Sequence, residues 1–579
     1  MSVPGATHAV LNQPPPLADW NPFTAEPSLA EALRREGAGW AEERVRAFGE
    51  LVGRRETIAW GVQANAHPPL LRTHDRTGRR IDEVELHPAW HALLGLGVEN
   101  AVHALPWREP RAGAQVARAA MFLTLAQVEA GVGCPLSMTF SAVPALTAQP
   151  ELAAEWLPRL TATAYDPRPA PAPEKAGALC GMAMTEKQGG SDVRANTTAA
   201  RPLGTGGPAA EYELTGHKWF CSAPMCDVFL VLAQAPGGLS CFLVPRFTPD
   251  GERNRFHLQR LKDKLGNRSN ASSEIELQAA WGRLVGEEGR GVATILAMVN
   301  HTRLDCVLGS AGLMRQAVAE ALHYARHRRA FGRRLAEQPL MVNVLADLVV
   351  ESEAATVSAM RLARAFDEAP GPFRRLATAV LKYWVCKRAV AHAAEALECL
   401  GGNGYVEEWG MARLYREAPL NSIWEGSGNV QCLDVLRTIA QRPESLAALL
   451  GEIELARGAD RRLDAWTAAL REELRPGPVG GGTRAADGDE ADEIKVEAGA
   501  RRLVERLALA LQASLLLRHS PPAVAAAFCA TRLILLCHKI TLSRGDHTTD
   551  SAGGKPRESV PGAISKSQSK QGCGAQVAG

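Results

Sequence analysis

Residues 211–220 read EYELTGHKWF, and three more β-prone runs follow: DVFLVLAQ at 227–234, LSCFLVP at 239–245 and SEIELQ at 273–278. Gly, Pro and Asn residues separate the runs, a pattern that is typical of strands joined by turns. We therefore expect a small β-domain over residues 177–283.

The segments on both sides of this β-domain repeat apolar residues at spacings of three and four, which indicates amphipathic helices. The low aromatic content, 5%, and the many Ala, Leu, Arg and Glu residues also favour helix. These observations predict a mostly α protein in an α-β-α order. The expected helical segments are residues 28–61, 85–131, 292–331, 339–369, 372–400 and 430–442.

The ends of the chain differ in composition from the segments between them. The Pro-rich start indicates an extended arm that lies on another surface, or a disordered lead. The run TATAYDPRPAPAPEK at 161–175 cannot continue a helix and marks a boundary. We expect an arm at 1–27, an N-terminal helical domain at 28–176, the β-domain at 177–283, a second helical domain at 284–442, an additional helical module at 443–545 and a disordered tail at 546–579.

Composition excludes several classes of protein. With 46% hydrophobic and 22% charged residues over 579 positions, the chain is neither disordered nor fibrous. A net charge of +2 excludes a chain that is basic throughout. No run is long and apolar enough for a spanning helix, and no leader peptide begins the chain, so we expect a cytoplasmic protein. None of the 12 cysteines forms a CxxC pair, so we expect buried thiols and no metal site.

Charge changes sign along the additional module. Residues 476–493, PGPVGGGTRAADGDEADE, are polar, Gly-rich and acidic, and we expect a flexible loop there. Residues 494–545 then carry eight Lys or Arg against two Glu. Such a segment can bind DNA phosphates in a salt-sensitive way, or form a dimerisation helix with a solvated basic face. The candidate DNA-binding residues are Arg501, Arg502, Arg506 and Arg518.

Two motifs lie in or beside the β-domain. MAMTEKQGGSDVRANTT at 182–198 combines a Gly-Gly-Ser turn with the hydroxyls of Thr185 and Ser191, which suits a polar ring edge or a phosphate. An ordinary capped turn is the alternative. GHKWFCSAP at 216–224 places a Trp at a strand end, where the ring can pack on a flat cofactor or simply join the core.

Two more motifs lie in the second helical domain. YARHRRAFGRRL at 324–335 crowds arginines around Phe331, which favours an anion such as pyrophosphate or else forms a solvated charged face. The segment 400–431 contains LGGNGY and NSIWEGSGN, and the second of these presents Glu425 between an indole and glycines. A carboxylate in a partly apolar pocket has a raised pKa and can remove a weakly acidic C–H proton. The alternative is a carboxylate that stabilises a helix N-terminus.

The order TEKQGGSD, KWF, RxAFG, LGGNGY and WEGSG resembles the acyl-CoA dehydrogenase family over residues 60–442. TEKQGGSDVRANTT, RLKDKLGNRSNASSEIE and NSIWEGSGN are similar to its adaptive-response, AidB-type branch. The resemblance implies a helical domain, a middle β-barrel-like domain and a four-helix domain that bind FAD as a homotetramer. It also implies weak dehydrogenation of short branched substrates such as isovaleryl-CoA, with DNA binding and protection against alkylation. An ordinary metabolic acyl-CoA dehydrogenase is the alternative.

The same resemblance assigns roles to individual residues. Glu425 is the expected catalytic base, with Arg303 of a Thr-Arg pair beside it. Arg328 is expected to reach the FAD of a neighbouring subunit. The expected cofactor contacts are Met182, Met184, Thr185, Gly190, Ser191, Trp219, Phe220, Cys221, Ser222, Arg328, Phe331, Gly401, Gly402, Trp424, Ser427 and Asn429.

Four positions depart from the common family pattern. Lys187 stands where many members have Pro, Cys221 replaces a common flavin-bonding Thr, and Glu398 replaces a Gln before the Gly-Gly turn. Pro339 also lies where Gln is common. Backbone contacts can absorb these changes, so we expect FAD binding but inefficient use of ordinary acyl-CoA substrates.

Overall fold

The computed structural model describes residues 7–475 and 490–534. The N-terminal part is mainly helical, and residues 7–26 run along the surface before it. Asn12 in that segment accepts a hydrogen bond from Arg328 and donates one to the carbonyl of Arg329. The elements are α1 (Pro27–Leu33), η1 (Arg34–Ala38), η2 (Gly39–Ala41), α2 (Glu42–Val52), α3 (Arg55–Ala66), α4 (Pro88–Glu99), α5 (Leu105–Arg108), α6 (Ala114–Ala126), α7 (Gly133–Leu146) and α8 (Pro150–Leu160).

A hairpin interrupts these helices, and the sequence analysis did not predict it. Strand β1 (Leu70–His74) pairs antiparallel with β2 (Arg80–Glu85). Its turn is an Asp-Arg-Thr-Gly segment in which the Asp75 carboxylate accepts hydrogen bonds from the backbone N–H groups of Thr77 and Arg79. Most of its side chains are polar and at least partly exposed, so it carries little of the apolar alternation that marks a strand.

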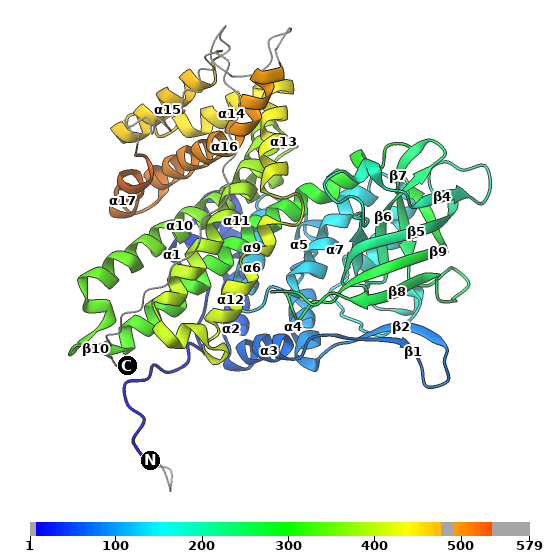
Figure 1. The fold of residues 1–579 in the computed structure, drawn as a ribbon, viewed down its shortest axis with the longest axis horizontal. Helices are drawn as coiled ribbons and strands as arrows, with labels where there is room; N and C mark the ends of the chain where they lie inside the picture. The colour runs from blue at the N-terminus through cyan, green and yellow to red at the C-terminus, as the bar shows by residue number, and fades with distance from the viewer. Residues whose placement is uncertain (1–6, 476–489, 535–579) are drawn as a thin grey trace, which may run out of the picture. The chain divides into compact units, whose positions relative to one another are not determined.

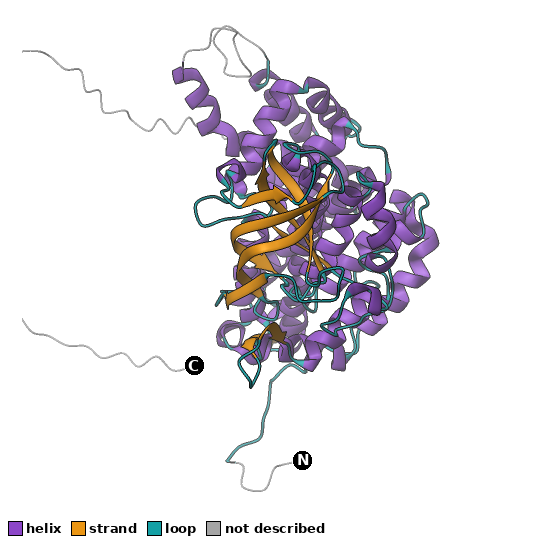
Figure 2. Cartoon of the chain, turned by 90° about the vertical axis from the view of Figure 1, so that its right-hand side faces the viewer, coloured by secondary structure: helices purple, strands orange, loops and turns teal. Residues whose placement is uncertain are grey.

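The middle region is a curled β-sheet, as Figure 2 shows. Strands β3 and β4 share one edge of β6, and β7 occupies the other edge, so that β6, β4, β5, β9 and β7 close on themselves. All four β-prone runs are strands, and the β-barrel-like expectation is confirmed. The strands are β3 (Cys180–Ala183), β4 (Ala199–Pro202), β5 (Glu211–Ser222), β6 (Val228–Ala235), β7 (Gly238–Pro245), β8 (Phe256–Leu261) and β9 (Ser272–Val285), with η3 (Ala172–Glu174) and η4 (Val193–Ala195) between them.

Three long helices, α9, α10 and α11, run side by side after the sheet (Figure 1). The first ends at His327, short of the predicted residue 331, because a small hairpin begins at Arg329. The elements are α9 (Gly291–His327), β10 (Arg329–Ala330), β11 (Arg333–Arg334), η5 (Leu335–Glu337), α10 (Pro339–Asp367), α11 (Pro372–Glu398), η6 (Gly401–Tyr405), η7 (Glu407–Trp409), α12 (Met411–Glu417), η8 (Leu420–Ser422) and α13 (Gly428–Gln441).

The predicted additional module is helical in its described part. It consists of α14 (Pro443–Glu454), α15 (Arg461–Glu473), α16 (Glu490–His519) and α17 (Pro522–Arg532). The prediction of an acidic loop over residues 476–493 is wrong for its last four residues, because residues 490–493 form the first turn of α16. The rest of that loop, residues 476–489, and the expected tail at 546–579 lie outside the described residues. No helix among the described residues is long and apolar enough to cross a membrane.

A buried ion pair joins α6 to α9. Arg118 donates to Asp305 through Nη2 at 2.8 Å, and its Nε donates to the carbonyl of Val102 at 2.9 Å. The guanidinium also lies 3.8 Å from the ring centre of Phe140. Both charged side chains are almost completely buried, so removing one partner would leave the other charged and unpaired in the core.

We predict that Arg118→Met destabilises the protein by about 3–5 kcal/mol, because Asp305 loses its buried partner. The measurement is the midpoint of chemical unfolding. Arg118→Met combined with Asp305→Leu should recover part of the loss, and Arg46→Met, at an exposed ion pair of α2, should change little. An Arg118→Met protein as stable as the parent would contradict this account.

Candidate functional site

A cavity of about 1,230 Å³ lies between the β-domain and the helices. Eleven of the predicted catalytic and cofactor residues line it, although they come from widely separated parts of the chain. They are Met182, Met184, Thr185, Gly190, Ser191, Phe220, Ser222, Arg303, Trp424, Glu425 and Ser427. The structure therefore brings three of the four sequence motifs to one place.

One face of α9 forms a wall of this cavity. Residues of α9 from Val292 to Leu313 line it at spacings close to three and four, as one face of a helix requires. At 1.5 Å of rise per residue, this face extends for about 30 Å. Thr302 lies near its middle, so the cavity continues along α9 in both directions from that residue.

Glu425 lies in a strained turn beside Thr302. Its φ angle is 56° and that of Gly426 is 94°, both in the left-handed region that a Glu seldom adopts. The Thr302 hydroxyl donates to Glu425 Oε2 at 2.6 Å, and Arg303 Nε donates to the Glu425 carbonyl at 3.0 Å. Strain of this kind costs about 1–3 kcal/mol and persists only where neighbours hold it.

Burial raises the pKa of Glu425 above its ordinary value. The Thr302 hydrogen bond opposes this effect, as do the positive charges of Lys382 and Arg303. The carboxyl is therefore a stronger base than an exposed Glu, while its neighbours keep it able to ionise. That is the property required to remove a weakly acidic C–H proton.

Arg303 is fixed by a carboxylate behind it. Asp434 on α13 accepts from Arg303 Nη1 at 3.4 Å and from Arg375 Nη2 at 2.7 Å. Although burial opposes it, the Arg375 and Arg303 guanidinium groups hold the pKa of Asp434 below its usual value. The cavity wall on this side is thus a charged network that sets the direction of Arg303.

The loop at the other wall is held by Glu186. Its carboxylate accepts from Lys218 Nζ at 2.7 Å, from Thr198 Oγ1 at 2.6 Å and from Thr197 N at 2.7 Å. Glu186 follows Thr185 directly, so these bonds fix the segment that presents Thr185 to the cavity. The departure from the family pattern at Lys187 therefore leaves this loop well anchored.

The residues on the β-domain side fit a flavin. The hydroxyls of Thr185, Ser191 and Ser222 face the cavity as donors for a polar ring edge, and Met182 and Met184 supply apolar surface. Gly190 approaches Thr185 so closely that an added Cβ would lie 3.1 Å from its methyl carbon. A side chain there would press on the threonine that the motif presents.

At the strand end, the structure places Ser222 at the cavity and leaves Cys221 out of it. Strand β5 bulges relative to β9 between Lys218 and Cys221, which changes the side-chain alternation. Cys221 is fully buried in the β-domain. The expectation that Cys221 lines the same edge as Ser222 is therefore corrected.

The other predicted cofactor residues do not line the cavity. Trp219 has Lys262 Nζ 3.2 Å from a ring centre. Phe331 is 99% exposed at the tip of the β10–β11 hairpin, and Arg328 Nη1 donates to the Asn12 carbonyl at 2.7 Å. The full set is Trp219, Cys221, Arg328, Phe331, Gly401, Gly402 and Asn429.

Partners from other helices offset the basic charge of the additional module. Arg506 pairs with Glu473, and Arg518 pairs with Glu452 at 2.7 Å. Arg501 donates to Asn429 Oδ1 at 2.8 Å. Arg502 is the most exposed of the four candidates, with 76% of its side chain exposed, and it forms a longer ion pair with Glu473 at 3.7 Å. The excess of positive charge that was counted over residues 494–545 does not include these partners, because they lie elsewhere in the chain.

Sequence reasoning missed two lysines near the site. Lys382 donates to the carbonyls of Trp424 and Gly426, on both sides of Glu425. Lys264 lines the cavity, and burial lowers its pKa to about 8. Lys382 stands in the apolar run AVLKYWV and Lys264 stands in the quoted motif RLKDKLGNRSNASSEIE. For Lys382, the signal in the sequence was a single charged residue within an apolar helical run.

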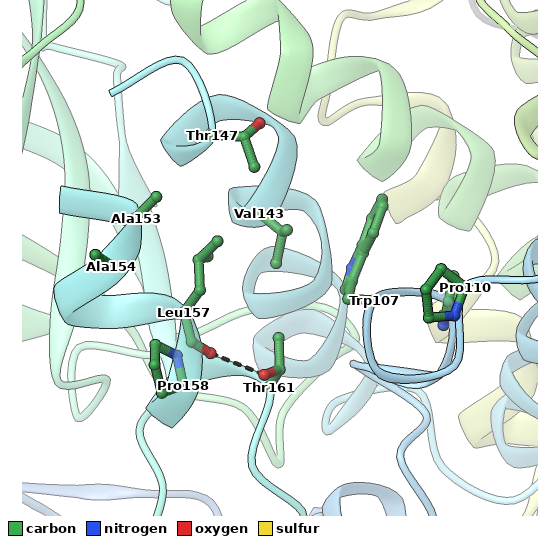
Figure 3. A pocket seen from close by; sticks show the side chains of 10 residues that line it. Trp107, Pro110, Val143, Thr147, Ala153, Ala154, Leu157, Pro158 and Thr161 are labelled. Atoms are coloured by element: carbon green, nitrogen blue, oxygen red, sulfur yellow. Dashed lines mark hydrogen bonds between the residues drawn. The ribbon is translucent and has the colours of Figure 1, made fainter. Parts of the chain in front are cut away.

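A second, smaller pocket of about 520 Å³ lies among α5, α7 and α8 (Figure 3). Apolar side chains line most of it, including Trp107, Val143 and Leu157. It contains no acid, base or thiol, so it offers no chemistry. Within the part of the chain that the structure describes, no group of three or more His, Cys, Asp or Glu side chains is arranged to hold a metal ion, and the cysteines are buried and unpaired.

Three family patterns match this chain in succession. They are the adaptive response protein AidB N-terminal domain at residues 12–167, the acyl-CoA dehydrogenase middle domain at 181–280 and the acyl-CoA dehydrogenase C-terminal domain at 289–440. AidB of Escherichia coli (strain K12) is 45% identical over 533 residues, which cover 91% of this chain and 94% of that protein. The chain belongs to the acyl-CoA dehydrogenase family.

Two further comparisons extend the match. Acyl-CoA dehydrogenase family member 11 of Caenorhabditis elegans is 32% identical over 86% of this chain and 84% of its own length. The crystal structure of Caenorhabditis elegans ACDH-11 in complex with C11-CoA superposes with a TM-score of 0.80 at 28% identity, covering 91% of this chain and 94% of that chain. As a member of this family, the chain is an FAD-dependent oxidoreductase.

We predict that Thr302→Ala moves the pH dependence of flavin reduction. Glu425 must be ionised to act as a base, so the rate rises with pH through its pKa. Removing the Thr302 donor raises that pKa further, and the rising limb should move to higher pH. Stopped-flow reduction between pH 5 and 9 measures it. Thr302→Ser keeps the donor and should keep the limb in place; a limb that does not move in Thr302→Ala would contradict the assignment.

Proposed function

We propose that the protein dehydrogenates short branched acyl-CoA thioesters, such as isovaleryl-CoA, between their α and β carbons. The observation that carries this proposal is the partly buried Glu425, whose carboxyl accepts a hydrogen bond from Thr302 and faces the cavity. FAD, when bound, supplies the acceptor for the hydride that leaves the β carbon. Glu425 removes the α proton.

The other residues of the site orient this proton transfer. Arg303 and the backbone around Glu425 fix the carboxyl at the middle of the cavity wall. Thr185, Ser191 and Ser222 supply hydroxyl donors on the β-domain side, where the flavin ring would lie. Apolar residues of α6 and α9, among them Phe122 and Leu313, exclude water from the acyl group.

Polar groups at the cavity support a short acyl chain. Glu129, Asn267 and Glu417 all line it, and Glu417 accepts from Asn267 N at 2.6 Å. Glu129 accepts from Ser269 in the same region. An alkyl chain that reached these carboxylates would displace water from them without offering a hydrogen bond in return, which disfavours a long chain.

A panel of acyl-CoA thioesters from C4 to C12, mixed anaerobically with the holoenzyme, separates this proposal from the alternative. Slow reduction by short branched substrates supports it. Rapid reduction by one straight-chain substrate would favour an ordinary metabolic dehydrogenase.

We predict that Glu425→Gln lowers the rate of flavin reduction by at least about 100-fold, because the amide cannot accept the α proton. The variant should keep its flavin absorbance, since glutamine nearly matches the shape of the side chain. Glu444→Gln, at an exposed position of α14, is the control and should react like the parent. Loss of bound FAD in Glu425→Gln would assign Glu425 a structural role instead.

We also propose that the additional module binds double-stranded DNA and that the protein acts in protection against alkylation. Support comes from the match to an adaptive response protein and from Arg501 and Arg502, which lie on one turn of α16. Arg506 and Arg518 are already paired with carboxylates, so we expect them to contribute less to DNA binding than Arg501 and Arg502.

Reversal of the two exposed charges tests DNA binding. We predict that Arg501→Glu/Arg502→Glu weakens duplex binding and lowers the slope of log K against log salt concentration by about 2. Arg76→Glu, in the exposed turn between β1 and β2, is the matched control. Fluorescence anisotropy over a salt series gives the slope. Binding that does not depend on salt, or that survives the double reversal, would contradict the proposal.

We propose a homotetramer, supported by the large apolar side chains of Phe331, Leu340 and Tyr405, which are more than 80% exposed. A cytoplasmic location is also proposed. We also propose that the chain is divided into six segments, at residues 1–27, 28–176, 177–283, 284–442, 443–545 and 546–579.

A further inference from the structure

We infer that Lys382 is a positioning residue that holds the Glu425 turn in its reactive conformation. Lys382 lies in the middle of α11, and its Nζ donates to the Trp424 carbonyl at 2.7 Å and to the Gly426 carbonyl at 2.5 Å. The two acceptors flank Glu425. One ammonium group therefore spans the residue that carries the catalytic carboxyl. This inference rests on the proposed role of Glu425.

The environment of Lys382 is unusual for a lysine. The side chain is completely buried, and among the residues that the structure describes it forms no ion pair. Its neighbours on α11, Leu381 and Val385, belong to the apolar core. A buried charge without a direct ion pair is costly unless hydrogen bonds compensate for it. The two turn carbonyls provide that compensation.

Three successive carbonyls of the turn are bound by side chains from other elements. The carbonyl of Glu425 accepts from Arg303 Nε at 3.0 Å and from Gln431 Nε2 at 3.1 Å. The carbonyls before and after it accept from Lys382, and Gln431 also donates to the second. A left-handed Glu persists only where its surroundings hold it. Lys382 is the member of this set that bridges both sides of the residue.

The charge of Lys382 also acts on the carboxyl. It opposes the rise in the pKa of Glu425 that burial causes. Among the described residues, the other groups that face Glu425 are Thr302, Arg303 and Cys306 on α9 and Cys134 on α7. Asp434 lies behind Arg303 on α13, and Cys386 lies near Lys382 on α11. Without Lys382, Arg303 is the remaining positive charge that lowers the pKa of Glu425, and its guanidinium is already paired with Asp434.

The test compares Lys382→Met with Lys382→Arg in the holoenzyme, with Glu395→Gln as the control at an exposed position of α11. We expect Lys382→Met to lower the limiting rate of flavin reduction at least 10-fold at neutral pH while the KM changes less. The rising limb of its pH profile should move to higher pH. Lys382→Arg, which keeps the charge and the donors, should recover part of the rate.

Hydrogen exchange provides a readout that does not depend on activity. The backbone amides of residues 424–428 should exchange faster in Lys382→Met than in the parent, in Lys382→Arg or in Glu395→Gln. If Lys382→Met does not fold, Lys382→Gln, which keeps a donor but loses the charge, is judged by the same two measurements. An unchanged pH profile together with unchanged exchange would overturn the inference.

Flavin reduction and hydrogen exchange together separate the dehydrogenase proposal from the proposed role of Lys382. If no thioester reduces the parent flavin, the dehydrogenase proposal fails. The exchange comparison still decides whether Lys382 holds the turn.

Discussion

The buried pair of Arg118 and Asp305 is the constraint on which the site depends. Asp305 lies three residues after Thr302, on the cavity side of α9. Because Arg118 comes from α6, the pair fixes the rotation of α9 against the N-terminal helices. Thr302 can face Glu425 only in that rotation. A helix packed on several sides cannot turn gradually, so the pair and the cavity wall are set together.

The turn that carries Glu425, just before α13, is the second constraint on the site. Its carbonyls need donors, and these come from α9, α11 and α13 itself. The additional module supports the same helices from outside: Trp384 on α11 donates to Gln512 on α16 at 3.0 Å within the core. Arg501 on α16 also contacts Asn429 in the first turn of α13. The module is thus part of the support around the turn, whatever else it binds.

Much of the fold could be predicted from the sequence, because four β-prone runs and six helical segments carry strong periodicity. The β1–β2 hairpin could not, since most of its side chains are polar and at least partly exposed and give little apolar alternation. The same limit applies to the site. Motif order identified Glu425, but the bulge that moves Cys221 out of the cavity depends on pairing with β9. The pairing of Arg506 and Arg518 depends on distant carboxylates.

Lys382 illustrates the remaining difficulty. A lysine within AVLKYWV has no partner in its own helix, and the sequence does not reveal which carbonyls it meets. Its partners lie 42 and 44 residues further along the chain. Contacts of this kind are set by tertiary packing and leave only one local sign, a charge where an apolar residue would fit.

The hydrogen bond between Thr302 and Glu425 spans 123 residues of sequence. Loop closure over such a distance has to precede any gain from the contact, so contacts of this kind form slowly. During synthesis, the α9 wall leaves the ribosome well before the turn that completes it. The base therefore enters the cavity only after the turn before α13 has been made and has docked.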